Sequence, residues 1–107
     1  MMNNTWLEKF KQSVVPQLIQ EFNPEKMILF GSHIKGDADE DSDIDVIMVS
    51  KNFTDIPFIR RMPILLKRIN FDKHVDFICY SPKEFQKIQK TSSIVIDALK
   101  YGEFVVS

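Results

Sequence analysis

The feature that most constrains this chain is a run of four apolar residues, Val46–Val49, that follows a strongly acidic segment without a break. Six of the nine residues from Asp37 to Asp45 carry carboxylates. A strand that is apolar on both faces is typical of a sheet that is covered on both sides, whereas carboxylates favour water. The fold therefore has to bring dense negative charge to the end of a buried strand.

Length and composition are those of a small globular protein. With 107 residues, 44% hydrophobic and 27% charged, the chain fits a single domain over residues 1–107 and no disordered, collagen-like or membrane class. A net charge of -1 makes direct nucleic-acid binding unlikely on electrostatic grounds. Cys79 is the single cysteine, and residues 1–10 do not have the pattern of a signal peptide. We expect a cytoplasmic protein that does not contact a membrane.

The hydrophobic spacing predicts an α+β fold, with a small mixed sheet packed against helices. Apolar residues at three- and four-residue steps predict a first helix over residues 6–22, with a capping box at Thr5 and Glu8 and a kink at Pro16. Strands are predicted at Lys26–Phe30, Asp43–Ser50 and Val75–Tyr80, and a last edge strand at Glu103–Val106.

Further helices are predicted between and after these strands. Residues 56–69 have helical spacing that Pro57 and Pro63 should interrupt, which predicts one broken helix or two short ones. Ser81 is predicted to cap the start of a helix, with Pro82 at the first helical position and Glu84 three residues after the cap. The helical pattern continues to Leu99. Gly102 fits the end of that helix.

Asp43 and Asp45 are the first candidates for chemistry. Side chains alternate along a strand, so these two carboxylates point to the same face. Two unit charges about 4 Å apart repel by about 4 kcal/mol at an effective dielectric constant near 20. A divalent cation would remove this repulsion, and oxygen ligands favour Mg²⁺.

Asp76 is the third candidate, near the start of the strand Val75–Tyr80. If that strand lies beside the Asp43 strand, the spacing of about 4.8 Å between neighbours lets Asp76 share the metal site. Three carboxylates could hold two ions, the arrangement that stabilises the attacking and leaving oxygens in phosphoryl or nucleotidyl transfer.

Gly31 and Ser32 follow a predicted strand and could open a short helix. Free amides at a helix start bind anions, glycine allows close approach of a phosphate, and the serine hydroxyl adds a donor. Together with a metal at the aspartates, this pattern predicts a magnesium–nucleoside triphosphate as substrate.

These residues resemble the nucleotidyltransferase superfamily that includes DNA polymerase beta, and within it the minimal nucleotidyltransferases. The resemblance rests on Phe30-Gly31-Ser32, ten intervening residues, Asp43-Ile44-Asp45-Val46 and the later Asp76, with Gly36 and Ser42 also matching. It implies a polymerase beta palm-like fold.

The resemblance also implies roles. Gly31, Ser32, Lys35 and Ser42 would hold the triphosphate, Asp43, Asp45 and Asp76 would bind two Mg²⁺ ions and form the catalytic set, and ATP would be the expected donor. Members often carry arginine where this chain has His33 and Lys35. The family further implies a helical HEPN-type toxin as partner, silenced by transfer of AMP to a tyrosine, with a homo-oligomer possible.

Other functions stay open at this point. The chain could neutralise its partner by contact alone and keep the acidic residues as a nucleotide or metal sensor, or it could modify a hydroxyl of a small molecule such as an aminoglycoside. An EF-hand calcium loop is disfavoured, because the glycine and glutamate it needs are replaced by Ser42 and Met48.

Several residues have simpler structural interpretations. The acidic residues between Gly36 and Ser42 are expected to form a solvated turn, and Cys79 to pack in the core. His33 and His74 are expected at the surface or behind the ligands. The following basic residues are expected on the solvated side of a helix: Arg60, Arg61, Lys67, Arg68 and Lys73.

Overall fold

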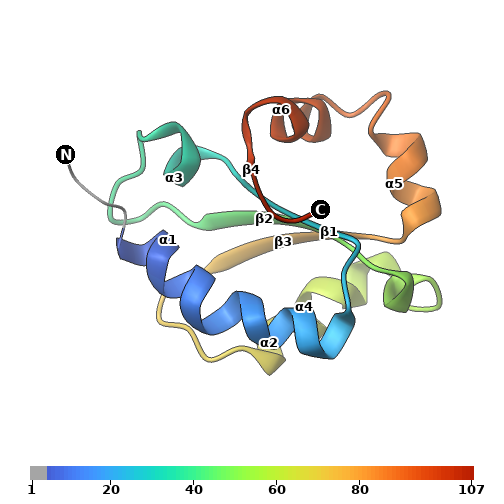
Figure 1. Cartoon of the computed structure of the whole chain (residues 1–107), viewed down its shortest axis with the longest axis horizontal. Coiled ribbons are helices and arrows are strands. Elements are labelled where there is room, and N and C mark those ends of the chain that lie inside the picture. The colour runs from blue at the N-terminus through green and yellow to red at the C-terminus, as the bar shows by residue number, and fades with distance from the viewer. Residues whose placement is uncertain (1–4) are drawn as a thin grey trace.

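The structure is a computed structural model that describes residues 5–107. It contains a four-stranded sheet, and Figure 1 shows helices on both sides of this sheet. The strand order is β3-β2-β1-β4. β1 is antiparallel to both of its neighbours, and β2 and β3 are parallel. The strands are β1 (Lys26–Phe30), β2 (Ile44–Val49), β3 (Val75–Tyr80) and β4 (Glu103–Val106). The predicted α+β fold with a mixed sheet is confirmed.

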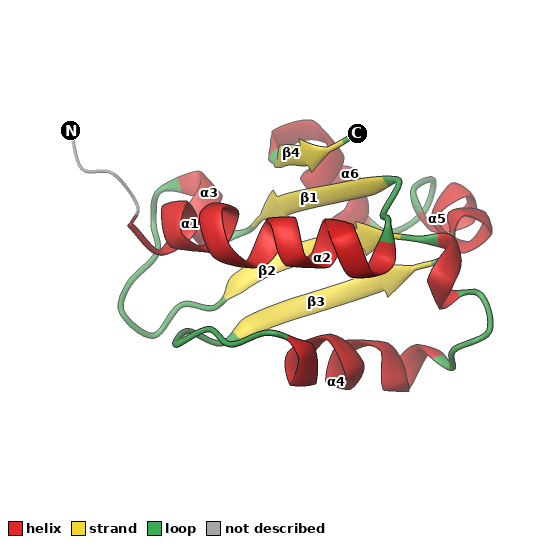
Figure 2. Cartoon of the chain, turned by 60° about the horizontal axis from the view of Figure 1, so that its bottom comes forward, coloured by secondary structure: helices red, strands yellow, loops and turns green. Residues whose placement is uncertain are grey.

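The helical segments alternate irregularly with the strands along the chain (Figure 2). They are α1 (Thr5–Lys9), the π-helical segment η1 (Phe10–Val14), α2 (Val15–Phe22), α3 (Ser32–Lys35), the 3-10 turn η2 (Lys51–Phe53), α4 (Phe58–Arg68), α5 (Pro82–Ile88) and α6 (Ser93–Tyr101). Within residues 5–107, no helix combines the length and apolar character needed to cross a bilayer.

Two hydrophobic clusters, one on each face of the sheet, hold the fold together. On one face, side chains from α1, η1, α2 and α4 pack against residues that include Val46 and Met48. On the other face, α5 and α6 pack against residues that include Ile47 and Val49. Burial of consecutive residues on both faces confirms the prediction for Val46–Val49.

The predicted kink at Pro16 takes the form of a π-helical segment. In η1 the wider turn is closed by the amide of Val15, which donates to the carbonyl of Phe10. Pro16, which has no amide hydrogen, then falls in the first turn of α2, where that hydrogen is not needed. Thr5 belongs to α1, and residues 1–4, which precede the predicted capping box, lie outside the described residues.

Two predictions about helix breaks are wrong. α4 is continuous although Pro63 lies inside it. The carbonyl that Pro63 leaves without a helical donor belongs to Ile59, which is 82% exposed, so water can satisfy it. Conversely, the helical pattern predicted from Ser81 to Leu99 is divided into α5 and α6, because the Ser92 side chain accepts the Val95 amide and starts a new helix. The predicted capping at Ser81 and ending at Gly102 are confirmed.

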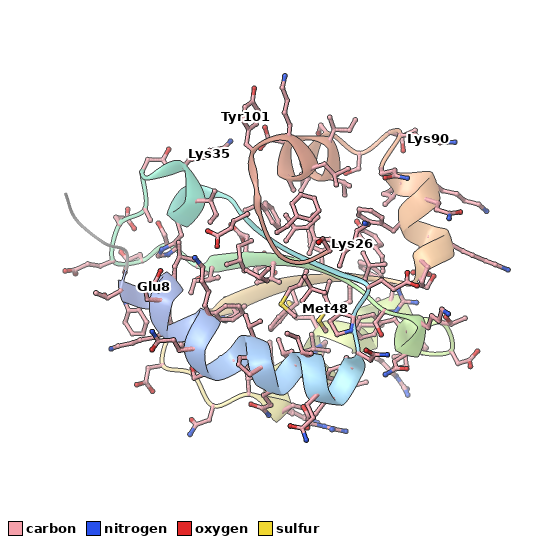
Figure 3. The ribbon with its side chains drawn as sticks, viewed as in Figure 1. Glu8, Lys26, Lys35, Met48, Lys90 and Tyr101 are labelled. Atoms are coloured by element: carbon pink, nitrogen blue, oxygen red, sulfur yellow. The ribbon has the colours of Figure 1, made fainter. Side chains whose placement is uncertain are left out.

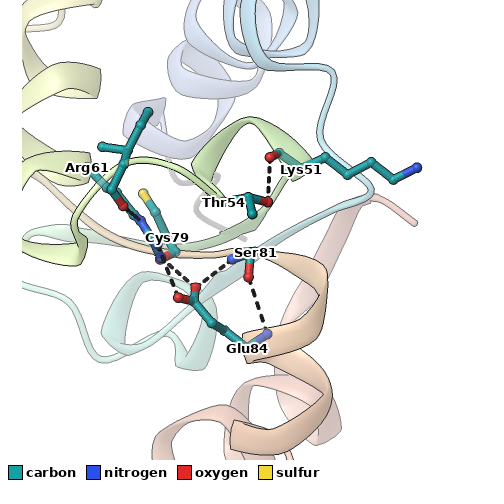
Figure 4. A network of polar contacts seen from close by, with 7 residues as sticks. Lys51, Thr54, Arg61, Cys79, Ser81 and Glu84 are labelled. Carbon is teal, nitrogen blue, oxygen red and sulfur yellow. Dashed lines mark hydrogen bonds and ion pairs between the residues drawn. The ribbon is translucent and has the colours of Figure 1, made fainter.

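Arg61 is not on the solvated side of its helix, which corrects the expectation for this residue. It is 3% exposed, and its guanidinium donates to both carboxylate oxygens of Glu84, at 2.6 and 3.1 Å. It also donates to the backbone carbonyls of Ile56 and Cys79, and Figure 4 shows Arg61 beside Cys79 and Glu84. Arg61 therefore ties α4 to the end of β3 and to the start of α5. Cys79 is buried in the core, as predicted.

Candidate active site

The centre of the candidate site is a pair of aspartates on neighbouring strands. Asp45 of β2 and Asp76 of β3 are register partners in the parallel pair, so their side chains project from the same face at the strand spacing of about 4.8 Å. Both residues are half-buried. Farther along β2, Ile47 and Val49 on this face are covered by α5 and α6. The fold thus leaves two carboxylates side by side where the helical cover thins.

Asp43 lies immediately before β2, which starts at Ile44 and not at Asp43 as predicted. It is exposed. The pKa of the Asp45 carboxyl is raised, first by burial, then by the charge of Asp76 and then by that of Asp43, while His33 opposes the shift. The electrostatic coupling shows that the structure brings all three predicted carboxylates into one neighbourhood.

Gly31, directly after β1, lies beside the carboxylate of Asp45. It follows Phe30, the register partner of Asp45, and it has φ +83° and ψ -156°, a conformation that favours glycine. A Cβ atom at Gly31 would overlap the Oδ2 atom of Asp45 and lie 3.1 Å from its Cγ. Only a glycine lets the chain turn into α3 while the Asp45 carboxylate occupies this position.

Ser32 begins the short helix α3, as the sequence predicts. The carbonyl of Gly31 accepts from the amides of Ile34 and Lys35, and the carbonyl of Ser32 accepts from the amides of Gly36 and Asp37. Among residues 5–107, no acceptor or donor contacts the Ser32 hydroxyl. This hydroxyl is therefore available to a ligand beside Asp45.

Ser42, the other predicted serine, organises the acidic turn. Its hydroxyl accepts from the Asp39 amide at 3.0 Å and donates to the Asp39 carboxylate at 3.1 Å. Its carbonyl accepts from Nε2 of His33 at 3.0 Å. His33 is 6% exposed, so of its two expected positions, at the surface or behind the ligands, the surface position is wrong, whereas His74 is exposed. The sequence contains no local signal for the His33 contact, because its partner is a backbone carbonyl nine residues away.

Lys35 forms an ion pair with Asp97 and not with any of the three candidate metal ligands. Its ammonium lies 3.2 Å from the carboxylate of Asp97 on α6, and Figure 3 shows it on the side of α3 that faces α6 and Tyr101. Both side chains of the pair are about half exposed, at 51% and 41%. Exposed pairs of this kind contribute about 0–1 kcal/mol, so the Lys35 ammonium can be drawn away by a stronger anion.

The carboxylates of Asp43, Asp45 and Asp76 are of the type that binds magnesium, although they do not converge on one point. Among residues 5–107, no three His, Cys, Asp or Glu side chains stand ready to hold a metal ion together. Carboxylate oxygens are the ligands that Mg²⁺ takes from proteins. The raised pKa of Asp45 shows an unfavourable concentration of negative charge that a divalent cation would relieve. The acidic residues of the preceding turn, from Asp37 to Asp41, are solvent-exposed as predicted.

Comparison with known proteins identifies the family. Residues 8–105 match the family model of the nucleotidyltransferase domain, and the chain belongs to this family. The resemblance to minimal nucleotidyltransferases is thereby confirmed.

Individual relatives agree with this assignment. The chain is 31% identical over 88 residues to a protein of Methanocaldococcus jannaschii named "Putative protein adenylyltransferase MJ0141", a match that covers 82% of this chain and 84% of the relative. Its fold is similar to that of a "putative nucleotidyltransferase" from Sulfolobus solfataricus, with a TM-score of 0.63, 24% identity and coverage of 94% of this chain and 78% of the other.

The fold alone does not carry the function. BolA1 from Arabidopsis thaliana superimposes with a TM-score of 0.53 at 16% identity, over 78% of this chain and 98% of that protein. A similarity at this level of identity concerns only the backbone, whereas function depends on the side chains, here those at the ends of β1, β2 and β3.

Proposed function

We propose that this nucleotidyltransferase moves AMP from magnesium-bound ATP to a hydroxyl group. The observation that carries the proposal is the in-register pairing of Asp45 with Asp76, with Gly31 directly against the Asp45 carboxylate. A phosphate bound beside Gly31 would lie next to these two carboxylates, neither of which forms an ion pair with another of residues 5–107. A triphosphate bound at Gly31 and Ser32 would bring its metal ions to the aspartates.

The proposed roles are those that the family resemblance implies, applied to the side chains at these positions. Asp43 and Asp45 would hold both Mg²⁺ ions, and Asp76 would hold the ion nearest the acceptor. Bound ions of this kind lower the pKa of an attacking hydroxyl and neutralise charge on the leaving group. The acceptor oxygen would bond to the α-phosphorus as the bond to the bridging α–β oxygen breaks, releasing pyrophosphate, and the hydroxyl proton would pass to Asp76 or to solvent.

The binding residues would act on the triphosphate itself. Gly31 permits its backbone to approach a phosphate, and the Ser32 hydroxyl would donate to it. Lys35 would exchange Asp97 for a phosphate oxygen, a change that costs little because the present ion pair is exposed. Ser42 would act through the turn that it organises with Asp39.

The acceptor we propose is a protein side chain. The printed name of the Methanocaldococcus jannaschii relative includes protein adenylyl transfer, and the family resemblance implies a tyrosine of a HEPN-type helical toxin. In this scheme the chain is the antitoxin, and the partner provides the surface that positions its own hydroxyl.

Labelled ATP tests the proposal. The protein is incubated with Mg²⁺, ATP labelled in the α-phosphate and the product of the neighbouring gene, and label on that product is measured. We expect label with the wild type and with Asp41→Asn, whose exposed carboxylate lies in the acidic turn. We expect at least a hundredfold less label with Asp45→Asn or Asp76→Asn.

Two other results would each indicate a different function. If no label is transferred but the wild type and the aspartate variants protect cells from the partner equally, the chain neutralises by contact alone. If label reaches an aminoglycoside or another small hydroxyl compound and no protein, the acceptor class in the proposal is wrong.

A further inference from the structure

His33 connects the two halves of the candidate site. It directly follows Ser32 in α3, and its ring is buried, with 6% exposure. The Nε2 atom lies 3.0 Å from the carbonyl oxygen of Ser42. A carbonyl can only accept, so Nε2 carries the hydrogen and donates it.

The accepting carbonyl belongs to the peptide bond that joins Ser42 to Asp43. On the other side of Asp43, the amide of Ile44 donates to the carbonyl of His74 at 3.2 Å. Asp43 is exposed and precedes β2, so its side chain gains little positional restraint from packing. The hydrogen bonds of its two flanking peptide groups therefore set where its carboxylate points.

The acidic turn does not supply this restraint by itself. Asp39 and Ser42 bond to each other, which closes the turn internally. Its carbonyl at Glu40 accepts from the Lys73 ammonium at 2.8 Å, but that bond is exposed and water competes for it. The Asp37 amide also donates to the carbonyl of Ser32 in α3, but that bond holds only the start of the turn. The partly buried bond from His33 joins α3 to the far end of the turn, next to Asp43.

We propose that His33 is a positioning residue that fixes the distance between the phosphate-binding segment, Gly31 and Ser32, and the metal ligand Asp43. This inference rests on the proposed function. Because His33 also neighbours Asp45 closely enough to affect its electrostatics, one side chain links the segment that holds the triphosphate with two of the three carboxylates.

Substitutions of His33 separate a hydrogen-bonding role from simple packing. His33→Gln keeps an amide donor at the position of Nε2, whereas His33→Leu fills similar space without a donor. Loss of a group that orients a metal ligand typically weakens metal binding or activity 10- to 100-fold. We expect a loss of that size in His33→Leu and recovery to within about threefold of wild type in His33→Gln.

The test combines two measurements on the full chain. Amide hydrogen exchange is measured without metal, and Mn²⁺ binding is measured by electron paramagnetic resonance in the presence of ATP. In His33→Leu we expect faster exchange at residues 42–44, unchanged exchange in β1, and Mn²⁺ binding 10- to 100-fold weaker than in wild type. His33→Gln should resemble wild type in both. If His33→Leu does not fold, His33→Asn, whose donor is one methylene too short, replaces it.

Two outcomes would overturn the inference in different ways. If His33→Leu binds Mn²⁺ as wild type does while Asp45→Asn does not, His33 is a packing residue and the proposed function stands. If wild type binds Mn²⁺ no better than Asp45→Asn, the proposed function fails and the inference fails with it.

Discussion

The backbone of Gly31 lies against the carboxylate of Asp45 so closely that no larger residue can occupy position 31 without moving that carboxylate. This contact joins the end of β1 to the start of β2 at the point where the sheet meets α3. It explains in steric terms why a glycine precedes Ser32, beyond the conformational freedom that the turn requires.

Gly31→Ala should therefore damage the site more than its backbone strain alone would. We expect a loss of about 2–3 kcal/mol in the free energy of unfolding and no measurable binding of Mg²⁺–ATP. Gly36→Ala is the matched control, because Gly36 has φ +86° but nothing within 4 Å of the added Cβ. It should lose about 1 kcal/mol and bind nucleotide normally. Equal effects of the two variants on nucleotide binding would contradict the steric account.

Asp45→Asn should inactivate the protein but stabilise it. The substitution removes a partly buried charge that Asp76 and Asp43 repel. Because solvent screens a carboxylate that is only partly buried, the metal-free variant should gain less than about 1 kcal/mol, and its Tm should rise by less than about 4–8 °C. Thermal unfolding in EDTA measures the gain. A variant no more stable than wild type would mean that the carboxylates do not repel each other appreciably.

The same pair of proteins should differ in the pH dependence of stability. The pKa of Asp45 is raised in the folded protein, so the ionised carboxylate destabilises the folded state. This penalty is absent below the unfolded pKa and develops as the pH rises through the folded pKa. The stability advantage of Asp45→Asn should therefore be present at neutral pH and disappear on acidification, as followed by urea unfolding from pH 7 to pH 3.

The bond between Arg61 and Glu84 should make stability fall in acid for a different reason. Arg61 lowers the pKa of Glu84 below its ordinary 4.5, so the contribution of this pair is present above pH 4.5 and is lost as the pH falls through the folded pKa. Glu84→Gln should lose about 1–2 kcal/mol at neutral pH, less than the roughly 3–5 kcal/mol of a fully buried pair, because the Glu84 side chain is 44% exposed.

A second carboxylate provides the control for Glu84. Glu21 pairs with Arg68 at 3.4 Å on the surface, so Glu21→Gln should change the free energy of unfolding by less than about 0.5 kcal/mol. If the two variants are equally stable, the buried guanidinium of Arg61 does not depend on Glu84.

Variants of Lys35 and Asp97 test whether the Lys35 ammonium leaves Asp97 to bind the triphosphate. Lys35→Met should weaken Mg²⁺–ATP binding about tenfold, the equivalent of one charge-assisted hydrogen bond. Asp97→Asn should leave binding unchanged or tighten it, because it removes the present partner of the ammonium. Equal weakening in both variants, measured by calorimetry, would show that Lys35 acts by holding α3 against α6.

Local patterns in the sequence predict the strands and the face of β2 from which Asp45 projects, whereas the position of Asp76 beside Asp45 depends on the pairing of β2 with β3, which local patterns do not give. Alternation places Asp45 on one face of β2, and the apolar run after it requires a sheet covered on both sides, as observed. The break at Ser92 is missed because the residues before and after it, such as Phe85 and Val95, pack into one cluster and keep one helical spacing.

Contacts between segments that are distant in the sequence could not be predicted from local patterns. Arg61 is interpreted as a solvated charge because its partner, Glu84, lies 23 residues away. For His33 the sequence leaves a surface position and a position behind the ligands open, because its acceptor is a backbone carbonyl, which has no sequence signature. In both cases the burial of a polar side chain depends on a partner that only the folded chain supplies.

The metal-binding role of the three aspartates is the central claim, and a crystal structure with Mn²⁺ and a non-hydrolysable ATP analogue tests it most directly. We expect anomalous density for Mn²⁺ coordinated by Asp45 together with Asp43 or Asp76, and the triphosphate at Gly31 and Ser32. Density for Mn²⁺ confined to the acidic turn between Asp37 and Asp41, with no ion at Asp45, would contradict the account.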